Sequence, residues 1–148
     1  MIINKNNGNI LNTKDIYVHD DIFISLEFKN DNKMMLLKLK KYSNKRNYDI
    51  VLKDIIGFEM SACDFWGKSE CVFDFEYVEP QEHLLIPKLK KRWENEAKSS
   101  YDIFNNCIEV IITFTSGNEL RVACASIEIK TGNKTGNKTG KVRQGGLT

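Results

Sequence analysis

The amino-acid sequence predicts an α+β domain with a mainly antiparallel, curled sheet of about six strands and one helix before the C-terminal hairpin. Three observations predict this class. Several runs alternate apolar and polar residues with the period of a strand. Turn-forming residues join most of these runs closely, which favours antiparallel pairing. One stretch, residues 81–98, has apolar residues at the spacing of an amphipathic helix.

The strongest strand pair is predicted over residues 107–129, the most apolar and β-branched part of the chain. Residues 116–118 carry the turn signal, and two registers are open. A two-residue loop places Phe114 opposite Arg121, whereas a three-residue loop places Phe114 opposite Leu120. Because strand register follows the apolar pattern, we expect the second arrangement.

The earlier strands follow the same logic. Residues 22–28 and 34–40 should form a first hairpin, in which the even-numbered positions of the first run are buried. Residues 16–18 are expected to make a short edge strand. A further strand is predicted over residues 72–78, with three aromatic side chains directed inward, Phe73, Phe75 and Tyr77.

Two irregularities are expected within the strands. The long run over residues 48–60 should contain a break or bulge at Asp54 or Gly57. In the last strand, the apolar phase changes near residues 124–126. Either a β-bulge at this point or burial of both faces would explain the change.

The predicted helix contains Pro87, which suits a first helical position. Leu89, Trp93 and Ala97 then lie on one face. Bases stand near the start of this helix and acids near its end, an order that opposes the helix dipole. We therefore expect packing, chiefly through Trp93, to hold the helix.

Charge and composition divide the chain into a domain with two flanking segments. Residues 15–129 are expected to form a single domain, and the Asn-rich residues 1–14 to be loosely held. Residues 130–148 are of low complexity and contain five bases and no acid, so we expect a disordered tail. The rest of the chain then carries a net charge of −3, against +2 for the whole.

Several classes of protein are disfavoured by the motifs that the sequence lacks. It has no apolar run of signal-peptide or membrane-span type, and its four cysteines form no CxxC pair. We expect reduced thiols in a cytoplasmic protein, without a structural metal or a cofactor. No nucleophile, metal-ligand or paired-carboxylate motif is present, so a non-catalytic protein is predicted.

A first candidate binding site is the loop that contains Asp64, Phe65 and Trp66, followed by Gly67. Two large aromatic residues between polar neighbours are typical of a contact loop, and Trp is enriched among binding hot spots. The alternative interpretation is structural, with Phe65 and Trp66 folded back over the core.

A second candidate site is an acidic stretch, residues 70–82, that contains no base. Residues 33–46, in contrast, carry six bases and no acid. Acids in such a patch would attract a basic partner, although both stretches could also be solvated strand faces that pair across the sheet. The acids proposed to bind the partner are Glu70, Asp74, Glu76 and Glu79.

The hairpin over residues 108–129, together with the loop at residues 64–67, resembles small bacterial domains of the polymorphic-toxin immunity protein type. The resemblance implies a cytoplasmic protein-binding module that neutralises a toxin partner. A hypothesis from a different class is nucleic-acid binding through residues 33–46 and the basic tail.

Overall fold

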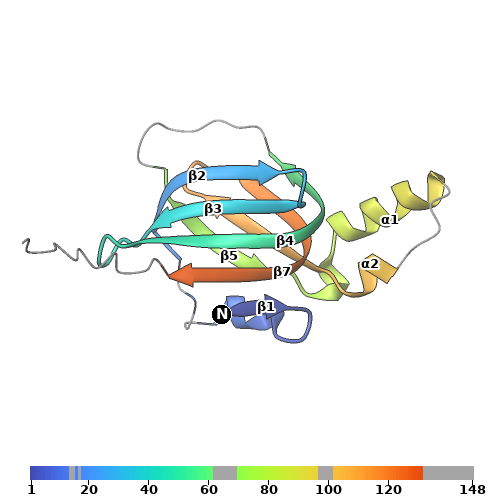
Figure 1. Cartoon of the computed structure of the whole chain (residues 1–148), viewed down its shortest axis with the longest axis horizontal. Helices are drawn as coiled ribbons and strands as arrows, with labels where there is room; N and C mark the ends of the chain where they lie inside the picture. The colour runs from blue at the N-terminus through green and yellow to red at the C-terminus, as the bar shows by residue number, and fades with distance from the viewer. Residues whose placement is uncertain (14–15, 17, 62–69, 97–101, 132–148) are drawn as a thin grey trace, which may run out of the picture.

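The computed structural model describes residues 1–13, 16, 18–61, 70–96 and 102–131. It confirms an α+β fold with an open, curled, antiparallel sheet (Figure 1). The strands within the described residues are β1 (Ile2–Asn4), β2 (Ile22–Lys29), β3 (Met34–Lys40), β4 (Asn47–Met60), β5 (Val72–Tyr77), β6 (Ile108–Phe114) and β7 (Glu119–Thr131). The helices are α1 (Leu85–Asn95) and α2 (Asp102–Asn105), with 3-10 segments η1 (Gly8–Asn12) and η2 (Pro80–Glu82).

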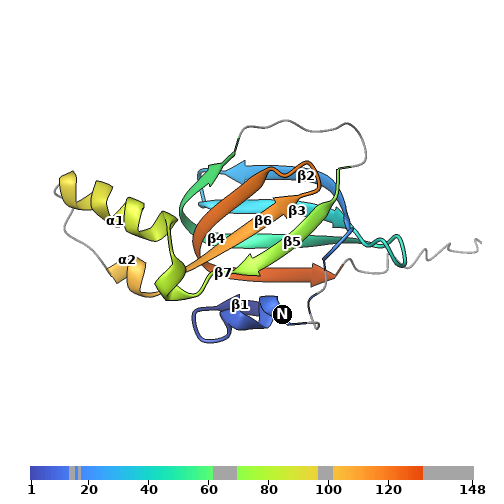
Figure 2. The ribbon, with the colours of Figure 1, turned by 180° about the vertical axis from the view of Figure 1, so that it is seen from behind.

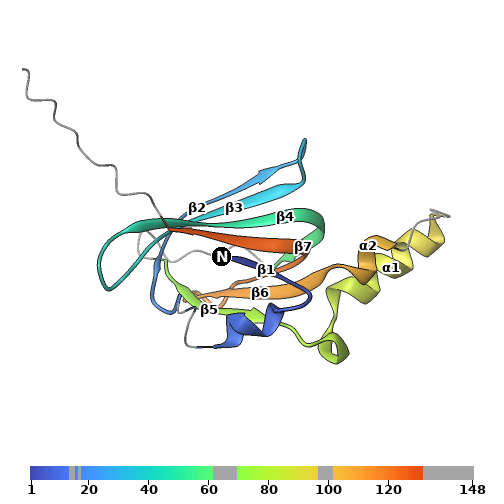
Figure 3. The ribbon, with the colours of Figure 1, turned by 60° about the horizontal axis from the view of Figure 1, so that its bottom comes forward.

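The strands follow the order β2-β3-β4-β7-β6-β5, and β1 pairs separately with β7. β7 pairs with β4 along most of its length. On its other side, β7 pairs with β6 over its first half and with β1 over part of its second half. In Figure 3, strands β2, β3, β4 and β7 form one layer, and β6 and β5 turn beneath it. Both helices lie at one end of the sheet (Figures 1 and 2).

The N-terminal segment, predicted to be loosely held, is instead part of the fold. β1 pairs antiparallel with the second half of β7, and η1 lies beside β5. Ile3 and Leu11 are buried in the main core. The prediction was wrong because these isolated apolar residues produce no strand or helix period. No strand is assigned at Ile16 or Val18, although Val18 is buried.

The main core fills the inner face of the curled sheet. As the alternation predicts, β3 and β6 contribute every second residue to it, and β7 does so on either side of its change of phase. Leu37, Ile112 and Val122, for example, are almost completely buried. This face rests on apolar side chains, each of which contributes about 1.5–3 kcal/mol when it is fully buried.

Two strands contain a bulge that turns one residue predicted to be buried outward, while Leu26, Phe75 and Tyr77 face the main core as predicted. The register of β2 shifts between Phe23 and Ser25, and the register of β5 shifts between Val72 and Asp74. One extra residue in a strand breaks the alternation at the bulge, so the side chain there leaves the face that a regular strand would give it. Ile24 and Phe73, which were predicted to be buried, are therefore 47% and 52% exposed.

The last hairpin has the predicted three-residue loop, but the register predicted with that loop was wrong by two residues. Ile112 pairs with Leu120, and the N–H of Phe114 donates to the carbonyl of Asn118. The loop has three residues and ends on Gly117, whose φ is +86°, as a three-residue loop with a G1 bulge requires. A slip of two residues leaves the buried face unchanged, so the apolar pattern alone could not select the register.

The irregularity predicted in residues 48–60 is present. The φ of Asp54 is +51°, and the pairing of β4 with β7 shifts between Ile55 and Gly57. Leu52 and Ile55, on either side of Asp54, both face the main core. The alternation of core-facing residues in β4 is therefore interrupted at this point. In the paired strand β7 the alternation is interrupted at the same level, between residues 124 and 127, and both strands bend there.

Helix α1 covers part of the outer face of the sheet and is held mainly at its first turn. Leu85 and Ile86 are buried in a second, smaller core, whereas Trp93 is only partly buried. The helix starts at Leu85, so Pro87 occupies the third position and not the first as predicted. Trp93 packs edge-on against Phe104, with ring centroids 5.6 Å apart, and is a secondary anchor.

A buried carboxylate from β6 supplies the negative charge that the helix's own sequence lacks at its N-terminus. Glu109 is fully buried and accepts hydrogen bonds from the backbone N–H groups of Leu84, Leu85 and Ile86, at 3.0–3.1 Å. Arg121 Nη1 lies 2.6 Å from the same carboxylate. Burial alone would raise the pKa of Glu109, but these N–H groups and Arg121 together hold it below its ordinary value.

Candidate functional site

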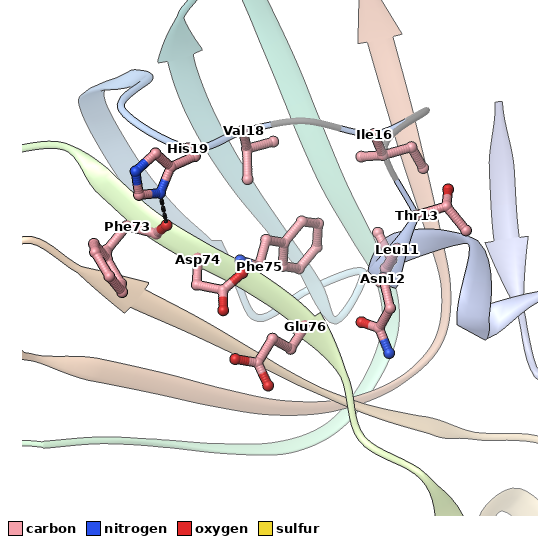
Figure 4. A pocket seen from close by; sticks show the side chains of 10 residues that line it. All are labelled: Leu11, Asn12, Thr13, Ile16, Val18, His19, Phe73, Asp74, Phe75 and Glu76. Carbon is pink, nitrogen blue, oxygen red and sulfur yellow. Dashed lines mark hydrogen bonds between the residues drawn. The ribbon is translucent and has the colours of Figure 1, made fainter.

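The candidate site is a cavity of about 590 Å³ between β5 and the segment that precedes β2 (Figure 4). β5 ends the strand order of the sheet, so one of its sides faces this segment and not another strand. The cavity is lined by Leu11, Asn12, Thr13, Ile16, Val18, His19, Phe73, Asp74, Phe75 and Glu76.

Polar groups cover both ends of this strand edge. The side-chain amide of Asn12 imitates a strand partner: it accepts from the N–H of Tyr77 at 3.0 Å and donates to its carbonyl at 3.2 Å. At the other end, His19 Nδ1 lies 2.5 Å from the carbonyl oxygen of Phe73 (Figure 4). Asn12 and His19 thus satisfy backbone groups that an edge strand would otherwise expose. The cavity lies between them.

Two carboxylates on alternate positions of β5 border the cavity. Asp74 Oδ1 accepts a hydrogen bond from the N–H of Phe75 at 2.9 Å, while the side chain of Glu76 is exposed. A hydrogen bond with Asp74, followed by partial burial and the charges of Asp74 and Glu119, raises the pKa of Glu76 to about 7. Close carboxylates repel each other when both are ionised. A cation beside the pair would relieve this repulsion.

An exposed aromatic ring stands beside the two acids. The β5 bulge directs Phe73 outward, and the ring of His19 packs against it with centroids 5.1 Å apart. Apolar surface next to a charged rim is the composition of many protein-binding patches. The cavity combines acidic groups, an aromatic ring and a partly covered strand edge.

Of the residues predicted from the sequence, Asp74 and Glu76 are brought together in this site. Glu79 is exposed beyond the end of β5 and does not line the cavity. Asp64, Phe65 and Trp66 lie outside the described residues.

Glu70 has a structural position that the charge pattern did not indicate. Its side chain is buried, and Oε1 accepts hydrogen bonds from Thr115 Oγ1 at 3.2 Å and from Ser116 N–H at 2.9 Å. Both partners belong to the β6–β7 turn. Glu70 therefore stabilises that turn, and its inclusion among the partner-binding acids is corrected.

Sequence reasoning missed most of the residues that line the cavity, among them Asn12, His19 and Phe73. Asn12 belongs to the segment predicted to be loose, and Phe73 was assigned to the core. His19 stands alone, without the spacing of a metal-ligand or catalytic motif. A cavity formed by tertiary contacts between two such segments leaves no periodic signal in either of them.

The basic stretch of residues 33–46 is divided by the fold. Lys33 lies in the β2–β3 turn at the helix end of the sheet, whereas residues 41–46 lie in the β3–β4 turn at the opposite end (Figure 1). Lys38 stands opposite Asp49 on β4, and Lys45 packs on the ring of Tyr42. The fold therefore separates Lys33 from the bases at the β3–β4 turn.

Another base of that stretch belongs to a buried network. Lys41 Nζ lies 3.2 Å from the buried carboxylate of Asp21, which also accepts a 2.5 Å hydrogen bond from the hydroxyl of Tyr48. Burial and the hydrogen bond with Asp21 raise the pKa of Tyr48 far above its ordinary value. Lys41 thus stabilises the fold near the β3–β4 turn.

No cluster of three or more His, Cys, Asp or Glu side chains that could hold a metal ion occurs among the residues that the structure describes. Within the same residues, no helix is long and apolar enough to cross a membrane. The chain matches no protein-family model, no curated protein and no solved structure.

Proposed function

We propose that this chain is a non-catalytic protein-binding module that takes a basic segment of a partner protein at the β5 cavity. The observation that carries the proposal is the Asp74–Glu76 carboxylate pair, held beside an exposed Phe73 at the edge of the sheet. A lysine or arginine of the partner would relieve the repulsion between these carboxylates.

The physical chemistry of the cavity favours a cation over a neutral group. Charge-assisted hydrogen bonds to carboxylates are about twice as strong as neutral ones. The ring of Phe73 adds a surface on which the stem of a lysine or the plane of an arginine can pack. Acidic groups on the rim would also steer a basic partner and accelerate its association.

A toxin-immunity role is the specific form of this function that we propose, in line with the resemblance of the final hairpin to immunity domains. The partner would then be a toxin domain with a basic surface, and the complex would form in the cytoplasm. The acidic balance of residues 1–129 supports such a partner.

The test is a pull-down from the native host with nuclease treatment, comparing the natural chain with a variant that carries Asp74→Asn and Glu76→Gln. Both substitutions keep the side-chain shape and remove the charge. We expect the natural chain to retain a protein with a basic surface, and the variant to lose it. A matched control is Glu27→Gln, an exposed acid on β2 outside the cavity.

The proposal fails if the double variant retains the same partner as strongly as the Glu27→Gln control. It also fails if nuclease treatment removes all captured protein, because the contact would then run through a nucleic acid.

A further inference from the structure

Strand β4 extends further than its neighbour β3, and the extension forms an edge of the sheet. β3 pairs with β4 as far as Met35 and Leu52, and the N–H of Ile55 then donates to the carbonyl of Lys33 at 2.9 Å. Beyond this point β4 pairs with β7 alone in the part of the chain that the structure describes.

The direction of the backbone groups on this edge follows from the pairing with β7. The N–H of Ser61 donates to the carbonyl of Glu119 at 3.0 Å, so these two residues face each other as a hydrogen-bonded pair. Such pairs alternate along antiparallel strands. The N–H and C=O of Phe58 therefore point away from β7, toward the side that β3 has left. An edge of this kind can accept an extended chain as an additional strand.

A groove of about 430 Å³ lies between this edge and helix α1. Phe28 and Phe58 form an apolar wall with ring centroids 5.2 Å apart, and they are 42% and 43% exposed. Gly57 allows the helix to approach, because a Cβ at this position would lie 2.8 Å from Leu89 Cδ1. The groove thus offers an aromatic surface for the apolar side chains of an occupant.

The charged residues of the groove are predominantly basic. Lys33, Lys88 and Arg92 line it together with one acid, Glu59, which pairs with Lys88 at 3.2 Å. Lys33 and Arg92 therefore remain to attract negative charge from an occupant. This charge is opposite to that of the β5 cavity.

We propose that an acidic, extended segment of a partner protein binds in this groove by adding a strand to the edge of β4. Its backbone would exchange hydrogen bonds with Phe58, its apolar side chains would pack on Phe28 and Phe58, and its carboxylates would lie near Lys33 and Arg92. This surface is independent of the β5 cavity, because it uses a different strand and takes a partner of opposite charge.

The experiment selects ligands from a phage library of random 12-residue peptides against the whole chain, and measures the binding of the selected peptides by fluorescence anisotropy. We expect the enriched peptides to carry net negative charge and to contain aromatic or β-branched residues. Arg92→Glu should weaken their binding about tenfold or more by charge repulsion at the groove. Lys91→Glu is the matched control, because Lys91 is exposed on the same helix but does not line the groove; it should change binding less than about twofold.

Two further readouts distinguish strand addition from simple charge attraction. Phe58→Ser should weaken binding about tenfold or more, as truncation of a hot-spot aromatic does. Hydrogen exchange of the Phe58 amide should slow in the complex, because that N–H would gain an acceptor.

Four results would overturn the proposal. The selection could enrich no peptide, or only neutral and basic ones. The acidic peptides could bind the Arg92→Glu and Lys91→Glu variants equally well. A 20-residue oligothymidylate could displace them with the same dependence on Arg92, which would assign the groove to a nucleic acid. Sedimentation could show a dimer that Phe58→Ser dissociates, which would assign the edge to a second copy of this chain.

Discussion

The inner and outer faces of the sheet are stabilised by different physical means. The inner face holds a large core of alternating apolar side chains. The outer face holds a smaller apolar cluster under α1, next to the buried Glu109 carboxylate and its partner Arg121. The inner face depends chiefly on apolar area, whereas the outer face also depends on one buried charged group, Glu109, that several partners must satisfy.

The largest loss of stability is expected from a substitution of the buried acid on the outer face. Glu109→Ala removes the acceptor for three N–H groups at the start of α1 and leaves Arg121 without its carboxylate. Breaking a buried charged pair in this way should cost about 3–5 kcal/mol of the free energy of unfolding. Urea denaturation measures the loss.

The pH dependence of that loss is the control. The folded pKa of Glu109 is lowered, so its stabilising contribution is present above its unfolded pKa and is lost as pH falls through the folded value. The difference between Glu109→Ala and the natural chain should therefore shrink in acid. Ile112→Ala on the inner face should cost about 2–5 kcal/mol with no such trend. A pH-independent effect of Glu109→Ala would contradict the assignment.

A smaller effect is expected along helix α1, where the first turn and the last turn differ. Trp93→Ala should cost about 2 kcal/mol, below the cost for a fully buried aromatic, because Trp93 is only partly buried against Phe104. Leu85→Ala, in the buried first turn, should cost more, about 2–5 kcal/mol. Thermal unfolding of both variants checks the order. If Trp93→Ala were the more damaging change, the helix would be held at its C-terminal end.

The two faces also differ in how well the sequence predicts them. The inner residues of β3, β6 and β7 follow from alternation, because a strand with one apolar face can bury it in only one way. Glu109 sits between apolar residues and was assigned to the polar face, yet it is fully buried. Only the tertiary position of α1 explains this burial, and no local period encodes that position.

The candidate site likewise contains some residues that the sequence predicts and others that it does not. Asp74 and Glu76 were predicted because a run of acids is visible in the sequence. Phe73 points outward because of a β-bulge in β5. A bulge inserts one residue into a strand, and the amino-acid composition does not reveal its position. The contribution of Asn12 and His19 depends on contacts between segments more than 50 residues apart, at Tyr77 and Phe73 respectively.

A still smaller effect is expected at the contact of β4 with the helix on the outer face. Gly57→Ala places a methyl group 2.8 Å from Leu89 Cδ1, and the flexible end of that side chain must move. The expected cost is about 1 kcal/mol, at the low end of overpacking effects. Adding Leu89→Ala to Gly57→Ala should cost less than the sum of the two single changes, because the clash is then absent. Additive losses would show that Gly57 does not set the approach of the helix.

The smallest effect concerns Glu76, whose charge affects stability in the opposite direction to that of Glu109. Both belong to the outer face, but the hydrogen bond with Asp74 raises the pKa of Glu76, whereas backbone N–H groups and Arg121 lower the pKa of Glu109. The folded pKa of Glu76 is raised to about 7, so the folded state favours its protonated form. Its stabilising contribution is present below the unfolded pKa and is lost as pH rises through about 7.

Glu76→Gln should therefore increase the free energy of unfolding at pH 8 relative to the natural chain, by less than about 1 kcal/mol because the side chain is exposed. Below about pH 4, where the glutamate is protonated in both the folded and the unfolded state, the two chains should unfold alike. The ionisation that costs stability also completes the negative charge of the β5 cavity. A basic partner should consequently bind the natural chain more tightly at pH 8 than at pH 6, and Glu76→Gln should reduce that difference. Partner binding with the same pH dependence in both chains would remove Glu76 from the site.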